Sequence, residues 1–165
     1  MYRVFTSLST AMPRLKAKER AEAPPTPTPL IGALLRLPHQ AVVARIHAAL
    51  ASHGLELTPT ELQVFLFPGP DGRRPIDLAR QCAMTRQAMN YVLAGLERHG
   101  YVERHDAGAP NARVVRVTEL GRRVIQVIRG EVLEVEREWA AHLGARRFES
   151  LRDTLRELAA WLGAP

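Results

Sequence analysis

Apolar side chains recur at spacings of three and four residues along most of this chain of 165 residues, a periodicity that predicts amphipathic helices. The pattern begins at Leu30 and continues to about Leu50, with Pro38 in between. Since proline lacks the amide hydrogen that a helix interior needs, we expect Pro38 to kink this first helix or to start a new one.

A second helix is predicted after Thr58, where the residue types match a helix start. Thr58 suits the N-cap, Pro59 the first helical position and Glu61 the third position of a capping box. The apolar pattern then runs to Phe65 and stops before residues 68–72, whose proline and glycine content predicts a loop.

The pattern over residues 75–98 predicts two helices joined by a tight turn, and the second of them has two different faces. Its apolar stripe consists of Met89, Val92, Leu93 and Leu96. Its opposite face, near the N-terminus, carries Arg86, Gln87, Asn90 and Tyr91, with Thr85 as the N-cap. Arginine, glutamine and asparagine side chains can hydrogen-bond base edges in a DNA major groove, and helix N-termini favour phosphates. We therefore predict a helix-turn-helix that reads double-stranded DNA.

Two short, valine-containing strands follow this motif at residues 101–105 and 114–117, on either side of a polar turn, and together they predict a hairpin. Thr118 then caps a long helix that should end at Gly144, and a last helix follows it. The predicted fold class is mainly α with a small β-hairpin wing: a winged helix-turn-helix flanked by N- and C-terminal dimerisation helices.

The flanking helices carry apolar faces that a small winged helix-turn-helix cannot cover by itself. We therefore expect a homodimer, with a monomeric helical bundle as the alternative. The predicted organisation is a disordered, proline-rich basic tail over residues 1–29, an N-terminal dimerisation helix over 30–57, a DNA-binding lobe over 58–117 and C-terminal dimerisation helices over 118–165. For the tail, the alternatives are an upstream start codon with Met12 as the true start, and a basic arm that contacts DNA.

Composition and charge are those of an ordinary globular protein with an anionic partner. Hydrophobic residues make up 46% and charged residues 24% of the chain, and the net charge of +6 favours a polyanion. No apolar stretch approaches the roughly 20 residues of a membrane helix, so we expect a cytoplasmic protein without membrane contact.

Residues for catalytic or metal chemistry are sparse. The single cysteine, Cys82, excludes an intrachain disulfide and a multi-cysteine zinc site. It falls four residues after Leu78, on an apolar helix face, which favours a buried, inert thiol over a redox sensor. His39 and His47 share one helix, where packing is the favoured role and a ligand pocket the alternative. Without metal-ligand spacing, a phosphate loop or a nucleophile elbow, the sequence predicts no enzyme, no cofactor and no metal.

The order of several short motifs over residues 30–162 resembles the MarR (multiple antibiotic resistance regulator) family. These motifs are Leu57-Thr58-Pro59-Thr60-Glu61, Leu78-Ala79, Met84-Thr85-Arg86-Gln87-Ala88-Met89-Asn90, Leu96-Glu97-Arg98-His99-Gly100-Tyr101-Val102-Glu103-Arg104 and Val117-Thr118-Glu119-Leu120-Gly121-Arg122. The resemblance implies a homodimeric winged-helix repressor with intertwined terminal helices. Many members respond to small phenolic or other lipophilic ligands. By the same resemblance, Arg86, Gln87, Asn90 and Tyr91 would face the major groove, with Thr85 near the backbone.

The wing departs from the family pattern. Members usually carry an Asp-Arg-Arg type turn whose arginine enters the minor groove, but Pro110 and Asn111 stand at those places here. Arg113 is our candidate substitute, and Arg104 and His105 are secondary candidates.

Taken together, the sequence predicts a sequence-specific DNA-binding regulator, a repressor that acts as a homodimer and is released from DNA by a small effector. The alternative is a non-specific or architectural DNA-binding protein, or a partner-binding winged-helix protein, without an effector. Poor sequence discrimination and a steep salt dependence would indicate this alternative.

Overall fold

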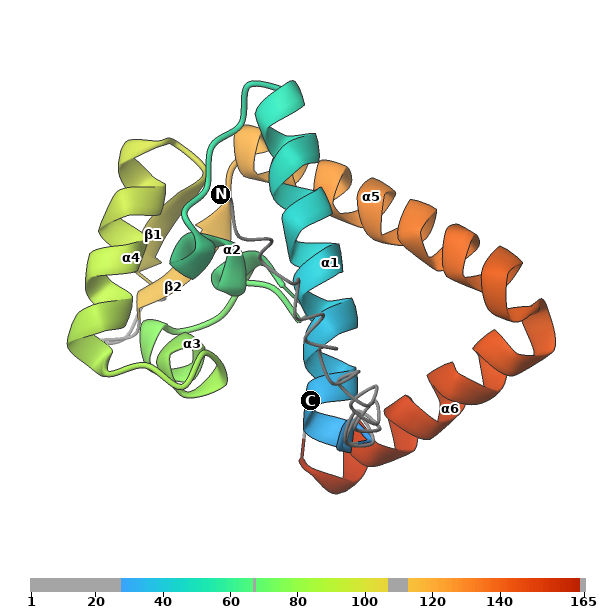
Figure 1. Ribbon diagram of the computed structural model, residues 1–165. Helices are drawn as coiled ribbons and strands as arrows, with labels where there is room; N and C mark the ends of the chain where they lie inside the picture. The colour runs from blue at the N-terminus through green and yellow to red at the C-terminus, as the bar shows by residue number, and fades with distance from the viewer. Residues whose placement is uncertain (1–27, 67, 107–112, 164–165) are drawn as a thin grey trace, which may run out of the picture.

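A computed structural model describes residues 28–66, 68–106 and 113–163, which form six helices and one two-stranded sheet (Figure 1). In chain order these are α1 (Ile31–Ser52), α2 (Pro59–Phe65), α3 (Pro75–Gln81), α4 (Arg86–Arg98), β1 (Val102–Asp106), β2 (Arg113–Val117), α5 (Glu119–Leu143) and α6 (Ala145–Trp161). The predicted fold class, mainly α with a small β-hairpin, is confirmed. Most of the predicted tail and the wing tip with Pro110 and Asn111 lie outside the described residues.

The winged lobe, by which we mean residues 58–117, lies on one side of α1, and α5 extends beyond α1 to the other side (Figure 1). The core forms where this lobe meets the second half of α1 and the first half of α5. Its most deeply buried apolar side chains are Ile46, Leu50, Leu62, Val64, Leu78, Met89, Leu93, Leu96, Val115 and Val124. The apolar stripe predicted for α4 is therefore part of this core.

Helix starts follow the predicted capping chemistry. At α2, the Thr58 amide donates to Glu61 Oε2 at 2.9 Å and the Glu61 amide donates to Thr58 Oγ1 at 3.2 Å, which completes the capping box. At α4, Thr85 Oγ1 accepts the Ala88 amide at 3.1 Å. These bonds satisfy amides that would otherwise lack an intrahelical partner.

Helix α1 is one continuous helix with Pro38 inside it, so the expectation that a new helix starts at Pro38 is wrong. A proline ring fixes φ at a helical value and removes a single hydrogen bond, that from position 38 to the Leu34 carbonyl. The later turns of α1 are held by Ile46 and Leu50, which are buried against the core, so tertiary packing offsets that local loss.

The hairpin pairs β1 with β2 antiparallel, with Arg104 opposite Val115, and both strands begin one residue away from the predicted position. Tyr101 precedes β1 because its amide closes the end of α4 by bonding the Leu96 carbonyl at 2.9 Å. The connection between α2 and α3 also joins the sheet: the Gly72 amide donates to the Val115 carbonyl and the Val115 amide donates to the Arg73 carbonyl, both at 2.8 Å. Sequence periodicity did not predict this third segment.

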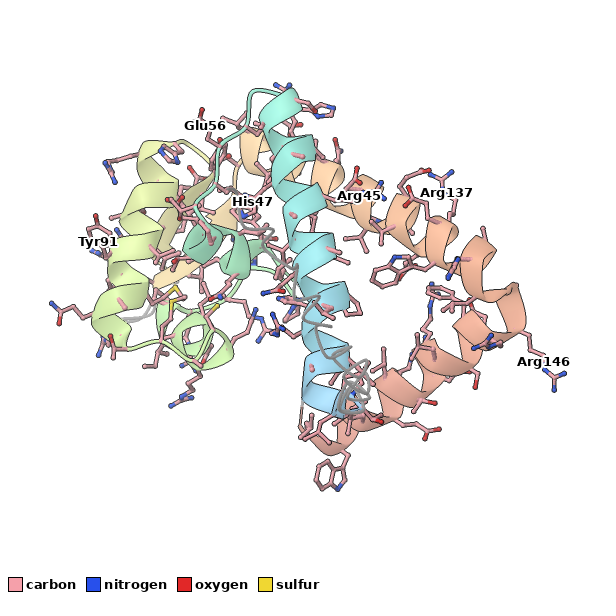
Figure 2. The ribbon with its side chains drawn as sticks, viewed as in Figure 1. Arg45, His47, Glu56, Tyr91, Arg137 and Arg146 are labelled. Atoms are coloured by element: carbon pink, nitrogen blue, oxygen red, sulfur yellow. The ribbon has the colours of Figure 1, made fainter. Side chains whose placement is uncertain are left out.

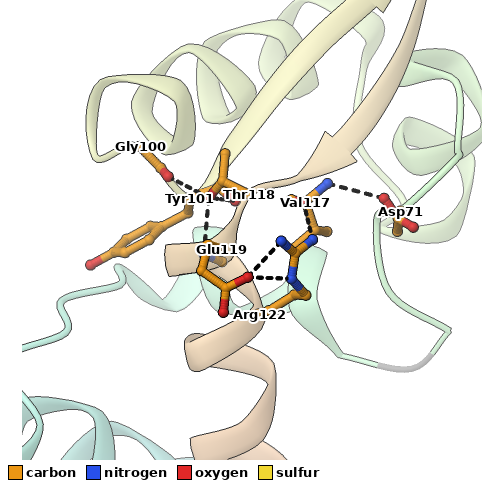
Figure 3. A network of polar contacts seen from close by, with 8 residues as sticks. Asp71, Gly100, Tyr101, Val117, Thr118, Glu119 and Arg122 are labelled. Atoms are coloured by element: carbon orange, nitrogen blue, oxygen red, sulfur yellow. Dashed lines mark hydrogen bonds and ion pairs between the residues drawn. The ribbon is translucent and has the colours of Figure 1, made fainter.

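A polar junction fixes α5 to the hairpin (Figure 3). Thr118 Oγ1 accepts the Gly121 amide at 3.0 Å and lies 2.6 Å from the Gly100 carbonyl oxygen, to which its hydroxyl donates. The Val117 amide donates to Asp71 Oδ1 at 3.0 Å. A Cβ atom at Gly121 would lie 2.0 Å from the Tyr101 carbonyl oxygen, so only glycine allows this approach.

Helices α1, α5 and α6 surround an open triangle in Figure 1. Arg45 of α1 ties this helix to α5 through ion pairs with Glu131, at 2.6 Å, and with Glu138. Gly144, with φ of 85°, turns the chain between α5 and α6. The described helices include none that is long and apolar enough to cross a membrane.

Candidate nucleic-acid interface

Helices α3 and α4 form the predicted helix-turn-helix. The turn between them is tight because the Cys82 amide bonds the Leu78 carbonyl at 2.9 Å and the Met84 amide bonds the Ala79 carbonyl at 2.8 Å. Ala83 has a positive φ of 50°, in the region that disfavours residues with a Cβ, so the turn stores some strain. Leu78 and Ala79 are buried, which anchors α3 beneath α4.

Helix α4 separates its two faces as predicted. Met89, Val92, Leu93 and Leu96 are buried. The residues at and after the start of α4 that were predicted to contact DNA are all exposed: Thr85, Arg86, Gln87, Asn90 and Tyr91. Tyr91 is 77% exposed and lies on the outer side of α4, away from α1 (Figure 2). The structure thus gathers these side chains on one exposed surface, hereafter the α4 outer face.

The electrostatics of the α4 outer face favour an anion. The first turn of α4 contains no acidic residue, and Arg86 forms no ion pair within the described part of the chain. Amide groups at a helix N-terminus carry partial positive charge, which adds to the charge of this arginine. A phosphate or an electron-rich base edge would therefore be stabilised here.

Arg104 is engaged in a bidentate ion pair with Glu97 of α4, with Nε 2.8 Å from Oε1 and a second contact between Nη2 and Oε2. Both side chains are about one-quarter exposed. The hydrogen bonds to the Glu97 carboxylate raise the pKa of the Arg104 guanidinium. Arg104 thus links β1 to the end of α4, a role that the sequence did not indicate.

The hairpin presents other polar side chains. Arg113, the first residue of β2, is exposed beside the wing tip, and His105 pairs with Glu103 through Nε2 and Oε1 at 2.7 Å. Arg116 is also exposed on β2, opposite Glu103. Sequence analysis missed Arg116, although its place between two buried valines, Val115 and Val117, signals an outward side chain.

The connection before α3 adds two arginines. The Arg73 carbonyl accepts the Val115 amide at the edge of the sheet. Arg74 forms an ion pair with Asp77, at 2.8 Å between Nε and Oδ2. This hydrogen-bonded pair raises the pKa of Arg74 and lowers the pKa of Asp77. Arg74 is therefore already charge-compensated by its own helix.

Cys82 caps α3 and is half-buried against the core, with Sγ 3.8 Å from the Gln63 carbonyl oxygen. Burial raises the pKa of the thiol, which disfavours the reactive thiolate. No group of three or more potential ligands that could hold a metal occurs among the described residues.

Comparison with known proteins bears on this lobe. The MarR family model matches residues 55–111, which contain α2, α3, α4 and β1. No curated protein matches the chain in sequence.

Solved structures share the fold. Transcriptional regulator PA4135 is 27% identical over 81% of this chain and 98% of its own, with a TM-score of 0.61. The Mycobacterium tuberculosis MarR-family protein Rv2887, solved in complex with DNA, is 27% identical over 79% of this chain and 98% of its own, with a TM-score of 0.58. Rv2887 has also been solved with salicylic acid. CouR bound to a 23-mer DNA duplex is 22% identical over 79% of this chain and 92% of its own, with a TM-score of 0.61, which shows a shared fold alone.

Proposed function

We propose that the protein is a MarR-family, sequence-specific transcriptional repressor that binds double-stranded DNA as a homodimer, because residues 55–111 match the model of that family. A small effector releases it from DNA. The observation that carries this proposal is the α4 outer face, where base-reading side chain types gather on one exposed helix surface opposite a buried stripe.

In this proposal, Arg86, Gln87 and Asn90 read base edges in the major groove, and Tyr91 packs beside them. Thr85 lies close to the backbone of the DNA, since the N-terminus of α4 favours phosphates. Arg113 reaches the minor groove or its phosphates from the base of the wing. Arg104 is a secondary candidate, because a phosphate contact would require its guanidinium to leave Glu97.

A homodimer is supported by apolar side chains that α1, α5 and α6 leave exposed. They are Leu30, Ile31, Leu34, Leu35, Leu37, Leu133, Leu151, Leu155, Leu158, Trp161 and Leu162. Many large apolar side chains exposed on the same three helices are what an interface between copies would cover. A two-fold dimer would present two α4 helices to successive major grooves, and in this proposal segments 30–57 and 118–165 form the dimer.

The effector in this proposal is of the phenolic class, like the salicylic acid bound by Rv2887, and it binds in the cleft between α1 and α5. This α1–α5 cleft, of about 430 Å³, has an apolar floor that includes Leu55 and Val127. Arg123 lines it and forms no ion pair within the described residues, so a carboxylate could pair with its guanidinium. Effector release requires a binding preference for the DNA-free state, and a coupling of about 1–3 kcal/mol would be typical.

The test of the proposed function is a fluorescence anisotropy titration of DNA fragments from upstream of the protein's own gene, with competitor DNA and at two salt concentrations. We expect one fragment to be retained against competitor. Arg86→Ala should weaken that specific complex by about 1–3 kcal/mol and weaken non-specific binding less. Arg147→Ala, an exposed arginine of α6 far along the chain from the α4 outer face, is the control and should change neither.

Binding that falls equally on every fragment as salt rises would favour a non-specific or architectural protein instead. Absence of DNA binding by the dimer would favour a partner-binding module. Equal losses of specific and non-specific affinity in Arg86→Ala would make Arg86 a phosphate contact.

A further inference from the structure

A second pocket, separate from the α1–α5 cleft except for the shared Leu55, lies between the end of α1, the connection to α2 and the end of α4. We call it the His47 pocket. Its volume is about 430 Å³, within the range of small-molecule sites. Its apolar lining includes Leu50, Leu55 and Leu57, which are nearly fully buried.

Two acceptor atoms at the His47 pocket lack a donor. His47 Nε2 is buried and has no hydrogen-bond partner in the described part of the chain. Figure 2 shows His47 on the side of α1 that faces the winged lobe. Glu61 is only 6% exposed; its Oε2 accepts the Thr58 amide, while Oε1 lies 4.0 Å from His99 Nδ1, too far for a hydrogen bond.

Neighbouring groups leave room around this carboxylate, and the His99 imidazole, 4.0 Å away, is an ion-pair partner when it is protonated. A Cβ at position 95 would lie 2.5 Å from Glu61 Oε1, so Gly95 is what allows the carboxylate to occupy its place. The pocket lining contains Glu56 and Glu61 but no lysine or arginine. The carboxylate has one donor, the Thr58 amide on Oε2, so a charged donor in the pocket would supply a second one at Oε1.

We propose that the His47 pocket binds a small primary amine with an apolar body. Its ammonium group donates one hydrogen bond to Glu61 Oε1 and a second to His47 Nε2, in the tautomer that carries its proton on Nδ1. The apolar body then lies on Leu50, Leu55 and Leu57. A carboxylate ligand is disfavoured because Glu56 and Glu61 would repel it, so this ligand class differs from the one proposed for the α1–α5 cleft.

The amine site does not depend on DNA binding and is tested without DNA. The ¹⁵N-labelled full chain is titrated by NMR and calorimetry with 2-phenylethylamine, and with 2-phenylethanol and phenylacetate as probes of the same hydrocarbon body. We expect the amine to shift amide signals at residues 55–61 and 99–101. The alcohol and the carboxylate should bind at least about tenfold more weakly, since neither supplies the charged donor.

Two variants test whether the charge of the Glu61 carboxylate binds the amine. Glu61→Gln keeps a residue that completes a capping box but removes the carboxylate, so it should weaken amine binding at least about tenfold while the thermal unfolding midpoint confirms folding. Glu157→Gln changes an exposed carboxylate of α6 and should leave binding unchanged. The proposal would be overturned by equal binding of amine and alcohol, or by unchanged binding in Glu61→Gln. It would also be overturned if signals shifted only at the α1–α5 cleft, or if millimolar amine did not bind.

Discussion

Gly121 and Gly130 both lie in α5, yet an added methyl group meets very different surroundings at the two positions. At Gly121 the new Cβ would be 2.0 Å from the Tyr101 carbonyl oxygen, whereas at Gly130 it would have no neighbour within 4 Å. We expect Gly121→Ala to lower the free energy of unfolding by about 3 kcal/mol, because backbone must move. Gly130→Ala should raise it by about 0.5–1 kcal/mol through helix propensity.

Urea unfolding followed by circular dichroism measures both variants. Equal effects of the two substitutions would contradict the close packing of α5 against the chain before β1.

Cys82 should react slowly in the native protein, since burial raises the pKa of its thiol. Its rate with a disulfide reagent at pH 8 should be below that of the same chain in denaturant, and should increase as the pH is raised further. The pKa of the Cys82 thiol is higher in the folded than in the unfolded chain. Its contribution to folding stability is therefore complete below the unfolded-state pKa, and it is lost as the pH rises through the folded-state pKa. If the native chain reacted as fast as the denatured chain, a redox-sensing role for Cys82 would be favoured instead.

At the scale of secondary-structure elements, the pair between Glu97 and Arg104 connects α4 to β1, and we expect this link to help fix the wing relative to the α4 outer face. We expect Glu97→Gln, Arg104→Gln and the double variant to weaken DNA binding by similar amounts, because each breaks the same link. The salt dependence of binding should stay unchanged. If Arg104 itself contacts a phosphate, Arg104→Gln should cost more than Glu97→Gln and reduce the salt slope by about 1.

Local signals made most elements predictable. Thr58, Thr85 and Thr118 each start a helix where the sequence indicated, because an N-cap acts through amides two or three residues away. The stripe of α4 was equally readable, since burial of one helix face leaves a 3.6-residue period.

What the sequence did not predict depends on residues far apart in the chain. The continuation of α1 through Pro38 follows from core packing of its later turns, which overrides a local breaker. The pairing of residues 72–73 with β2 and the partner of Arg104 are tertiary contacts with no periodic signature. The residues proposed to contact DNA remain predictions, although the structure groups those of α4 on one face.

At the scale of the whole molecule, the exposed apolar side chains of α6 are the feature that a second copy would cover. Leu158 and Trp161, one helical turn apart, are 39% and 81% exposed, so their replacement leaves the core intact. The double variant Leu158→Glu and Trp161→Glu should shift a dimer towards monomer in multi-angle light scattering, since each buried apolar side chain contributes about 1.5–3 kcal/mol. Glu157→Gln should remain dimeric, and a wild-type monomer would favour the helical bundle instead.

The junction at Gly121 makes α5 a stiff lever arm. Its 25 residues span about 37 Å, and its first turn is locked to the hairpin through Thr118 and Gly121. If α5 tilts by about 5° about its C-terminal end, its N-terminal end at the hairpin moves by about 3 Å, which is close to the rise of one base pair. In a two-fold dimer, a molecule that pivots α5 by a few degrees would put the two reading helices out of step with the DNA groove without altering the lobe itself.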